Sequence, residues 1–394
     1  MECVTATPSF DPPTRILMGP GPSGAHPRVL NAMTAPILGH LDPEFLKIMD
    51  ECNDMLRTVM GTTNRITLAT PGTGTSGMEA AVMNLVEPGD NVVVGICGYF
   101  GERIAVMAER AGGNVVRVPS RWGSPTDLAA VEAAVRAAGN VKLIGIVHAE
   151  TSTGVCTPVE PFAKLAKESG ALLLVDCVTS LGGVPVTVDA WGADAVYSGT
   201  QKCLSAPPGM APLTMSPRAW DAIKARETPC NSWYLDLSLL EAYWDERRAY
   251  HHTAPISMVY ALHQALALVL DEGLETRWAR HEKNGRALQA GLEAMGLGLH
   301  ADADYRLPVL TTALIPEGVN DAEVRGALLK RHGIEFGGGL GELRGKVWRI
   351  GLMGESSNAG NVLLAIRSLG GILREQGFKA DIRAGVDAAA ARLA

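Results

Sequence analysis

At 394 residues the chain is long enough to bury a large core, and two domains are the natural expectation. A net charge of −7 with no basic run argues against a nucleic-acid surface, and no apolar stretch approaches the ~20 residues that a membrane-spanning helix needs. The first residues show no basic flank followed by an apolar run, so we expect no secretory signal, and the seven cysteines contain no C-x-x-C pair. We therefore expect a cytoplasmic protein with reduced thiols and without disulfides or a metal site.

The first ~15 residues are rich in Pro and Thr and predict an extended arm. From residue 75 onward, helices alternate with short apolar strands. The expected helices are 75–86, 101–112, 127–138 and 161–170, and the expected strands are 91–96, 114–119, 141–150 and 171–176. Continuous apolar strands indicate a sheet that is covered on both faces. The pattern predicts an α/β domain with a mainly parallel sheet and a ligand at the carboxyl ends of its strands.

A second pattern follows the helical stretch 256–294. It has expected strands at 311–316 and 346–352, expected helices at 321–333 and 361–377, and an alanine-rich tail that favours a terminal helix. We read it as a smaller α+β domain. The predicted division is an arm over 1–20, a large domain over 21–275 and a small C-terminal domain over 276–394.

A glycine motif of the form G-x-G-x-x-G occurs at Gly72, Gly74 and Gly77, between a strand-like run and a helix. A nicotinamide-dependent oxidoreductase would use such a motif for a dinucleotide. That function also needs an acid at the end of the next strand, where residues 95–97 are Gly, Ile and Cys. The motif alone is a weak indication of a dinucleotide.

The same loop suits a single phosphate group. Gly74, Thr75 and Ser76 can direct backbone amides and hydroxyls toward an anion at a helix N-terminus. The simpler alternative is a small-residue helix start capped by Thr or Ser.

Lys202 and Asp176 predict the chemistry of the site. Lys202 lies in the small-residue turn SGTQKCLSAPPG, and Asp176 ends the strand ALLLVD. A lysine amine can form a Schiff base with an aldehyde cofactor, and a carboxylate can keep a pyridine nitrogen protonated, which together are the needs of pyridoxal 5′-phosphate (PLP). Phe100, in the loop after 91–96, can stack on the ring. Taken singly, the lysine would be a surface charge, the aspartate a turn residue and the phenylalanine a packing residue.

Arg349 lies in the apolar strand VWRIGL, where a charge is costly without a partner. The carboxylate of an amino acid substrate would be a bidentate partner. A structural salt bridge is the alternative.

Taken together, several segments resemble the class V aminotransferases of PLP fold type I, most closely the alanine–glyoxylate and serine–pyruvate enzymes. The matching segments are MGPGPS (18–23), TSTGV (151–155), LLLVDCVTSLGG (172–183), YSGTQKCLSAPPG (197–209), YHHT (250–253), RLP (306–308) and RIGLMG (349–354).

The resemblance implies a homodimer that holds PLP at its subunit interface. Lys202 would bind the cofactor covalently, Asp176 would face its ring nitrogen and Phe100 would stack on the ring. The phosphate region would be bound by Gly74, Thr75, Ser76 and Gln201, and by Tyr250 and Thr253 of the neighbouring subunit. Thr151 would contact the cofactor's ring hydroxyl or the substrate, while Arg349, Gly21 and Pro22 would bind the substrate.

The implied reaction moves an amino group from alanine or serine to glyoxylate or pyruvate by a ping-pong mechanism. Relatives usually have Trp where Phe100 stands and Ser where Thr151 stands, which leaves the substrate preference open. Donors such as pyridoxamine, aminophosphonates or taurine remain alternatives. A cysteine desulfurase-like lyase is another, although no cysteine follows Cys230.

Overall fold

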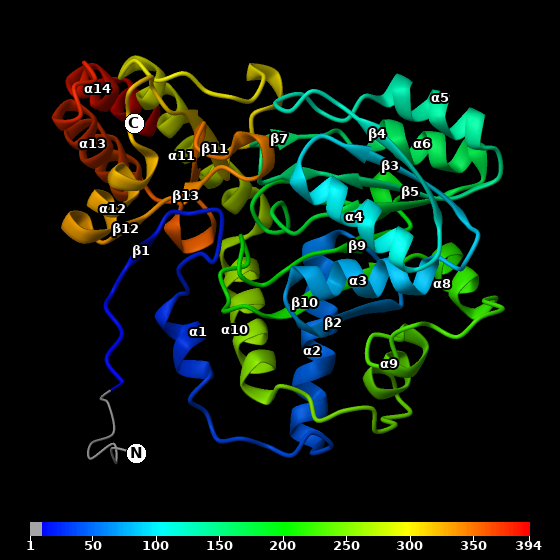
Figure 1. Cartoon of the computed structure of the whole chain (residues 1–394). Coiled ribbons are helices and arrows are strands. Elements are labelled where there is room, and N and C mark those ends of the chain that lie inside the picture. Colours follow the sequence, from blue (N-terminus) through cyan, green and yellow to red (C-terminus); the bar gives the residue numbers. More distant parts are fainter. Residues whose placement is uncertain (1–9) are drawn as a thin grey trace, which may run out of the picture.

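The computed structural model describes residues 10–394, so the first nine residues of the expected arm lie outside the described part. Its main feature is a seven-stranded sheet of order β2-β10-β9-β8-β5-β3-β4 (Figure 1). Only β10 runs against the others. The strands are β2 (Ile66–Gly72), β3 (Asn91–Ile96), β4 (Asn114–Pro119), β5 (Val141–Val147), β8 (Leu172–Asp176), β9 (Ala195–Tyr197) and β10 (Gly209–Met215). The predicted mainly parallel sheet is confirmed.

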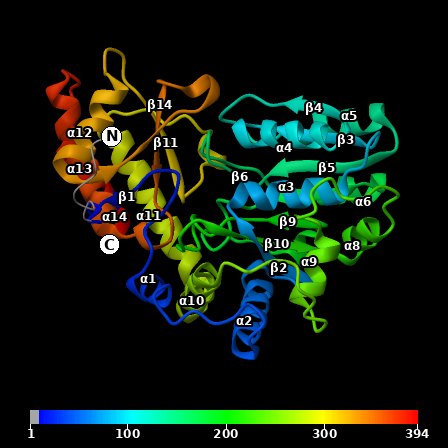
Figure 2. The ribbon, with the colours of Figure 1, turned by 60° about the horizontal axis from the view of Figure 1, so that its bottom comes forward.

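Helices cover both sides of this sheet (Figures 1 and 2). They include α2 (Pro43–Met60), α3 (Gly74–Leu85), α4 (Tyr99–Arg110), α5 (Leu128–Ala138), α6 (Glu160–Ser169), α7 (Val188–Trp191), α8 (Pro217–Lys224), α9 (Leu237–Trp244) and α10 (Ile256–Glu272). The five residues of β8 are all buried, as the continuous apolar run predicted. Burial on both faces explains why such strands lack a polar alternation.

Two features of this sheet differ from the sequence-based expectation. No strand was predicted at β10, because Pro207, Pro208 and Pro212 are unfavourable in the interior of a sheet. Pro212 nevertheless pairs with Ala69, since β10 lies between two strands that supply its partners. The expected strand 141–150 is also divided: β5 ends at Val147, and the short strands β6 (Ala149–Glu150) and β7 (Val155–Cys156) form a hairpin.

The C-terminal part has its own three-stranded antiparallel sheet and its own hydrophobic core. The strands are β11 (Leu310–Leu314), β13 (Gly337–Gly338) and β14 (Val347–Gly351), and the helices are α11 (Leu274–Ala294), α12 (Asp321–His332), α13 (Ala359–Glu375) and α14 (Ile382–Leu393). An α+β unit is therefore present, while a domain boundary at residue 275 stays a prediction.

The N-terminal segment ties the two parts together. Strand β1 (Ile16–Leu17) pairs in parallel with β12 (Ile334–Glu335) of the C-terminal part. Helix α1 (Pro27–Ala32), which follows in the chain, packs against α10 of the large part. Between them, Ser23 Oγ donates a 2.6 Å hydrogen bond to the carbonyl oxygen of Lys202. The segment thus runs over the turn that carries Lys202. In residues 10–394, no helix combines the length and apolarity needed to cross a bilayer.

Candidate active site

A cavity of about 200 Å³ lies at the carboxyl ends of the parallel strands, where a ligand was expected. The residues that line it follow β3, β5, β8 and β9 or begin α3. They are Gly74, Thr75, Met78, Phe100, Arg103, Val147, Ala149, Thr151, Asp176, Val178, Thr179, Gln201 and Lys202. The cavity therefore brings together seven of the residues that the sequence singled out.

Lys202 extends its amine into this cavity. Its Nζ donates to the carbonyl oxygen of Pro20, and Gly21 lies so close that a Cβ there would be 2.7 Å from Nζ. Burial, together with the positive charge of Arg349, lowers the pKa of Lys202 to about 8. A larger fraction of this amine is neutral near pH 7 than of an exposed lysine, which suits a nucleophile.

Asp176 lines the same cavity, at the end of β8. Its Oδ1 accepts a 2.8 Å hydrogen bond from the Val178 amide, and its Oδ2 accepts one of 2.8 Å from the Tyr197 hydroxyl. Burial raises the pKa of Asp176 to about 6, although both hydrogen bonds favour the carboxylate. A buried carboxylate with no cationic partner in contact is suited to accept a proton-bearing ring nitrogen.

The start of α3 forms the anion-binding end of the cavity. The amides of Gly74 and Thr75 have no hydrogen-bond partner within residues 10–394, and the buried amide oxygen of Gln201 is likewise unpaired. Ser76 is arranged differently from its neighbours. Its hydroxyl donates to the carbonyl oxygens of Thr73 at 2.8 Å and Pro71 at 3.2 Å, and it is absent from the cavity lining.

Phe100 and Val178 supply apolar side chains to the cavity lining, and Thr151 is a buried polar residue of the same lining. Gly74 also approaches Val178 closely, because a Cβ on Gly74 would be 2.8 Å from Val178 Cγ2. A flat ring between Phe100 and Val178 would be held on both faces. The sequence analysis missed Val178, although it lies two residues after Asp176.

Arg349 approaches the site from β14. The side chain is 8% exposed, its Nε donates a 2.7 Å hydrogen bond to the carbonyl oxygen of Gly338, and it pairs with no carboxylate of residues 10–394. Burial lowers the pKa of Arg349 to about 10. An unpaired buried guanidinium favours a ligand carboxylate over the structural salt bridge. Gly21 and the adjoining Pro22 lie on the N-terminal segment beside Lys202.

Tyr250 and Thr253 are not part of this cavity. Both lie in the loop between α9 and α10, Tyr250 is 64% exposed, and its ring packs against His40. The folded chain by itself does not bring them to the cofactor site.

Glu150 is a buried residue of the site that the sequence analysis did not identify. Its Oε1 accepts hydrogen bonds from the amide and hydroxyl of Ser152 at 3.0 and 2.6 Å, and its Oε2 accepts from the amides of Phe100 and Gly101 at 3.0 and 3.4 Å. It therefore caps α4 and holds the turn that carries Thr151. Burial raises the pKa of Glu150, while these four donors oppose the shift. An acid at the end of a second apolar strand, as at Asp176, is the signal that could have identified it.

We expect Glu150→Gln to lower the free energy of unfolding by about 1–3 kcal/mol, because the new NH₂ group would face buried donors. Urea denaturation measures this change. Glu132→Gln is a matched control, because the Glu132 side chain is 46% exposed and forms an i,i+4 ion pair with Arg136. A loss no larger than that of the control would contradict the capping role.

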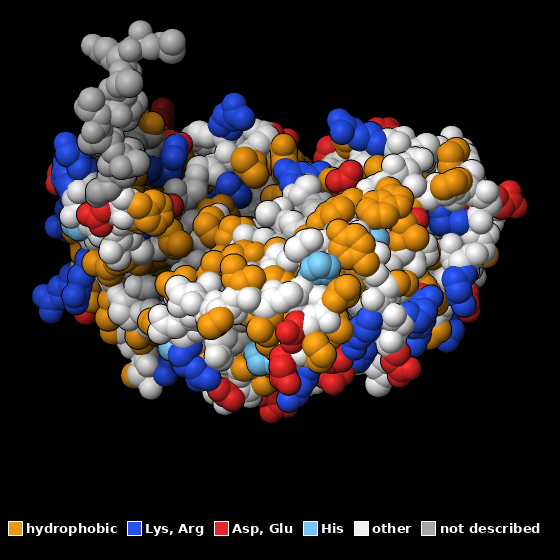
Figure 3. Space-filling model, turned by 90° about the horizontal axis from the view of Figure 1, so that it is seen from below, with side chains coloured by type: hydrophobic (Ala, Val, Ile, Leu, Met, Phe, Trp, Pro, Cys, Tyr) orange, Lys and Arg blue, Asp and Glu red, His pale blue; other side chains and the backbone are white. Residues whose placement is uncertain are grey.

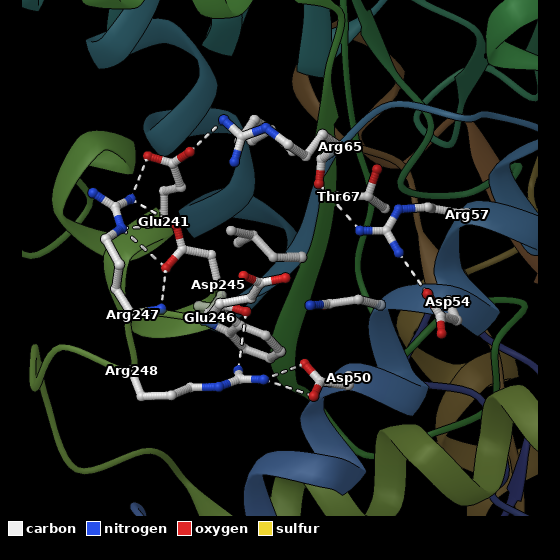
Figure 4. Close-up of a pocket in the computed structure, with 14 residues that line it drawn as sticks. Asp50, Asp54, Arg57, Arg65, Thr67, Glu241, Asp245, Glu246, Arg247 and Arg248 are labelled. Atoms are coloured by element: carbon white, nitrogen blue, oxygen red, sulfur yellow. Dashed lines mark hydrogen bonds and ion pairs between the residues drawn. The ribbon is translucent and has the colours of Figure 1, made fainter.

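A larger hollow of about 680 Å³ lies between α2, β2 and the end of α9 (Figure 4). Its arginines are all neutralised within the chain. The pairs are Arg57 with Asp54, Arg65 with Glu241, Arg247 with Glu241 and Asp245, and Arg248 with Asp50. This hollow offers no free positive charge to an anionic ligand, so the smaller cavity is the candidate site.

The residues of the smaller cavity fit PLP. An amine is available for its aldehyde, a carboxylate for its ring nitrogen, and apolar side chains for its two faces. The unpaired amides at the start of α3 would meet its phosphate.

Comparison with known proteins agrees with this fit. Residues 28–341 match the family described as aminotransferase class-V. The chain is 42% identical over 381 residues to the (S)-ureidoglycine–glyoxylate transaminase of Bacillus subtilis, covering 92% of this chain and 91% of that protein.

Two solved structures are similar over nearly the whole chain. An alanine–glyoxylate aminotransferase from Nostoc sp. is 50% identical with a TM-score of 0.92, covering 94% of this chain and 98% of that one. A pyridoxamine–pyruvate aminotransferase from Mesorhizobium loti is 31% identical with a TM-score of 0.92, covering 98% of both chains. The chain therefore belongs to the class V aminotransferases, a PLP-dependent family of fold type I.

Proposed function

We propose that the protein transfers an amino group from a small amino acid, alanine or serine, to glyoxylate or pyruvate. The observation that carries this proposal is the placement of Lys202 and Asp176 in one cavity with the unpaired Arg349 beside them. Glyoxylate as acceptor is supported by the names of two relatives, the transaminase from Bacillus subtilis and the aminotransferase from Nostoc. These two names and that of the pyridoxamine–pyruvate enzyme give three different donors and two acceptors, so the donor of this chain needs a direct test.

When bound, PLP supplies an aldehyde for the amino group and a ring that withdraws electrons from the substrate carbon. The amine of Lys202 would hold the cofactor and, once released by the donor, would move a proton from the substrate α-carbon to the cofactor side. Asp176 would accept a hydrogen bond from the ring nitrogen and stabilise its positive charge. Phe100 and Val178 would restrict the ring to one plane.

Arg349 would orient the substrate by binding its carboxylate through two parallel hydrogen bonds. The N-terminal segment at Gly21 and Pro22 would close the site above Lys202 and exclude water. Thr151 would contact the ring hydroxyl of the cofactor or the substrate. Since donor and acceptor use the same arginine in turn, one site suffices for both half-reactions, and ping-pong kinetics should follow.

A homodimer is part of this proposal. Hydrophobic side chains gather on the face that contains α1, α2, α9 and α10 (Figure 3). Exposed residues include Ile37 at 75%, Trp233 at 63% and Tyr250 at 64%. Such a surface is typical of an interface, and a dimer would bring Tyr250 and Thr253 of one subunit to the phosphate of the other. We expect sedimentation to give twice the mass of the chain, and Trp233→Glu to lower this mass and weaken PLP binding together. A wild-type monomer that binds PLP at full affinity would contradict the dimer.

The substrate is tested with a panel of donors and acceptors. L-alanine, L-serine, glycine, taurine, pyridoxamine and (S)-ureidoglycine would be assayed in turn against glyoxylate and pyruvate. We expect the highest kcat/KM with alanine or serine, and parallel double-reciprocal lines when donor and acceptor are varied. A kcat/KM at least tenfold higher with another donor would contradict alanine or serine as the donor. Intersecting lines would contradict the ping-pong scheme.

A desulfurase-like lyase is disfavoured by the cysteines. Desulfurization needs a reactive thiolate near the substrate, and none of the described cysteines lines the cavity. Burial raises the pKa of Cys203, the neighbour of Lys202, to about 12. Absence of sulfide release from L-cysteine would confirm this conclusion.

A further inference from the structure

Arg103 lies at the anion-binding end of the cavity and has no assigned role. It lines the cavity from α4, one turn after Phe100. No Asp or Glu of residues 10–394 forms an ion pair with it, and the adjacent Glu102 is engaged by Arg117 at 2.8 Å. Arg103 and Arg349 are therefore two arginines at this site that lack a carboxylate partner.

The position of the Arg103 guanidinium is fixed by three contacts. Its Nη1 donates a 3.0 Å hydrogen bond to Thr75 Oγ1. Its central carbon lies 4.9 Å from the centre of the Phe100 ring and 5.3 Å from that of Tyr99. A guanidinium has five N–H groups, and Thr75 takes one of them, so most of its donors are available to a ligand.

The electrostatics of this arrangement favour an anion. Thr75 is the second residue of α3, whose N-terminus carries partial positive charge and presents the unpaired amides of Gly74 and Thr75. A cation beside a helix N-terminus is unfavourable unless a negative group lies between them. A guanidinium and two backbone amides together match the geometry and charge of a phosphate monoester.

We propose that Arg103 binds the phosphate of PLP, together with the start of α3. This inference rests on the proposed function and adds a ligand to it. The substrate carboxylate is the other anion that enters the site, but Arg349 is available to it from β14. Arg103 is hydrogen-bonded to Thr75 at the start of α3, so its guanidinium lies where the phosphate end of the cofactor would bind.

The test compares two forms of the cofactor. The dissociation constants of PLP and of pyridoxal, which lacks the phosphate, would be measured by absorbance titration of the apoprotein for wild type, Arg103→Gln and Arg103→Lys. We expect Arg103→Gln to weaken PLP binding about 10- to 100-fold, the range for a lost hydrogen bond to a charged group, while pyridoxal binding changes by less than about twofold. Arg103→Lys should retain part of the affinity, since lysine keeps the positive charge but lacks the paired N–H donors of the guanidinium.

Arg110→Gln is the matched control, because Arg110 is an exposed arginine seven residues later on the same helix. It should bind both forms like the wild type. Equal weakening of PLP and pyridoxal in Arg103→Gln would overturn the proposal and leave Arg103 as a support for Phe100. Unchanged PLP affinity with a raised KM for the amino acid would overturn it in favour of a substrate contact. Either result leaves the covalent role of Lys202 untouched, since that role is tested separately by borohydride reduction.

Discussion

Lys202→Ala is expected to abolish transamination, lowering kcat by at least about 10²–10⁴-fold, the usual contribution of a positioned acid–base group. The variant loses both the amine that holds the cofactor and the group that moves the α-proton. Borohydride reduction followed by peptide mapping should label position 202 in the wild type and leave it unlabelled in the variant. Spectra of the purified protein should show the visible band of bound PLP in the wild type only.

Two controls separate chemistry from folding. Lys202→Arg keeps a positive charge but no nucleophilic amine, so it should be as inactive as the alanine variant. A small primary amine added to Lys202→Ala should restore part of the rate, because the cavity left by the side chain admits it. Full activity in Lys202→Ala, or a label at another lysine, would refute the assignment.

The pKa of Lys202 gives this assignment a pH dependence. Burial lowers the pKa to about 8. The fraction of the amine that is neutral therefore rises as the pH approaches that value, and most of the amine is neutral above it. Capture of PLP by the apoprotein should therefore accelerate about tenfold from pH 6 to pH 7 and level off above pH 8. Stopped-flow absorbance measures this rate, and a rate that still rises steeply at pH 10 would show an unperturbed lysine.

Asp176→Asn is expected to lower kcat by about 10²–10³-fold, because it removes preorganised negative charge from the ring nitrogen. An amide cannot stabilise the protonated ring as a carboxylate does. Asp176→Glu keeps the charge and should retain more activity than the asparagine variant, although its longer side chain displaces the carboxylate. A near wild-type kcat in Asp176→Asn would contradict the proposal that Asp176 stabilises the protonated ring nitrogen.

The same substitution should not destabilise the apoprotein. Burial raises the pKa of Asp176 from 3.8 to about 6, so its contribution to stability is present below pH 4 and is lost as pH rises through 6. At pH 7 the ionised group costs on the order of 3 kcal/mol, from about 1.4 kcal/mol per pKa unit. The asparagine variant avoids this cost but loses part of the bonding to Val178 and Tyr197, worth about 1–3 kcal/mol. Urea unfolding of the apoprotein at pH 7 should therefore show equal or greater stability, and a loss above about 2 kcal/mol would contradict the argument.

The fold class could be predicted from the sequence alone, and so could Lys202 and Asp176, the two residues that we propose as the chemical centre. Continuous apolar runs such as 172–175 predicted buried parallel strands, and Asp176 at the end of one of them was recognisable because that strand end is where a ligand binds. Lys202 stood out through its small neighbours. These signals are local, and each depends on residues that are close together in the chain.

Which groups of residues 10–394 lack a partner became visible only in the folded structure. Glu150 accepts hydrogen bonds from the amides of Phe100 and Gly101, which lie 50 and 49 residues earlier, and Arg103 of α4 donates to Thr75 of α3. Ser76 was predicted to point at an anion, but its hydroxyl bonds the backbone of its own turn. Charge, burial and hydrogen-bond pairing are properties of neighbours in space, and for this reason no reading of the sequence alone could assign them.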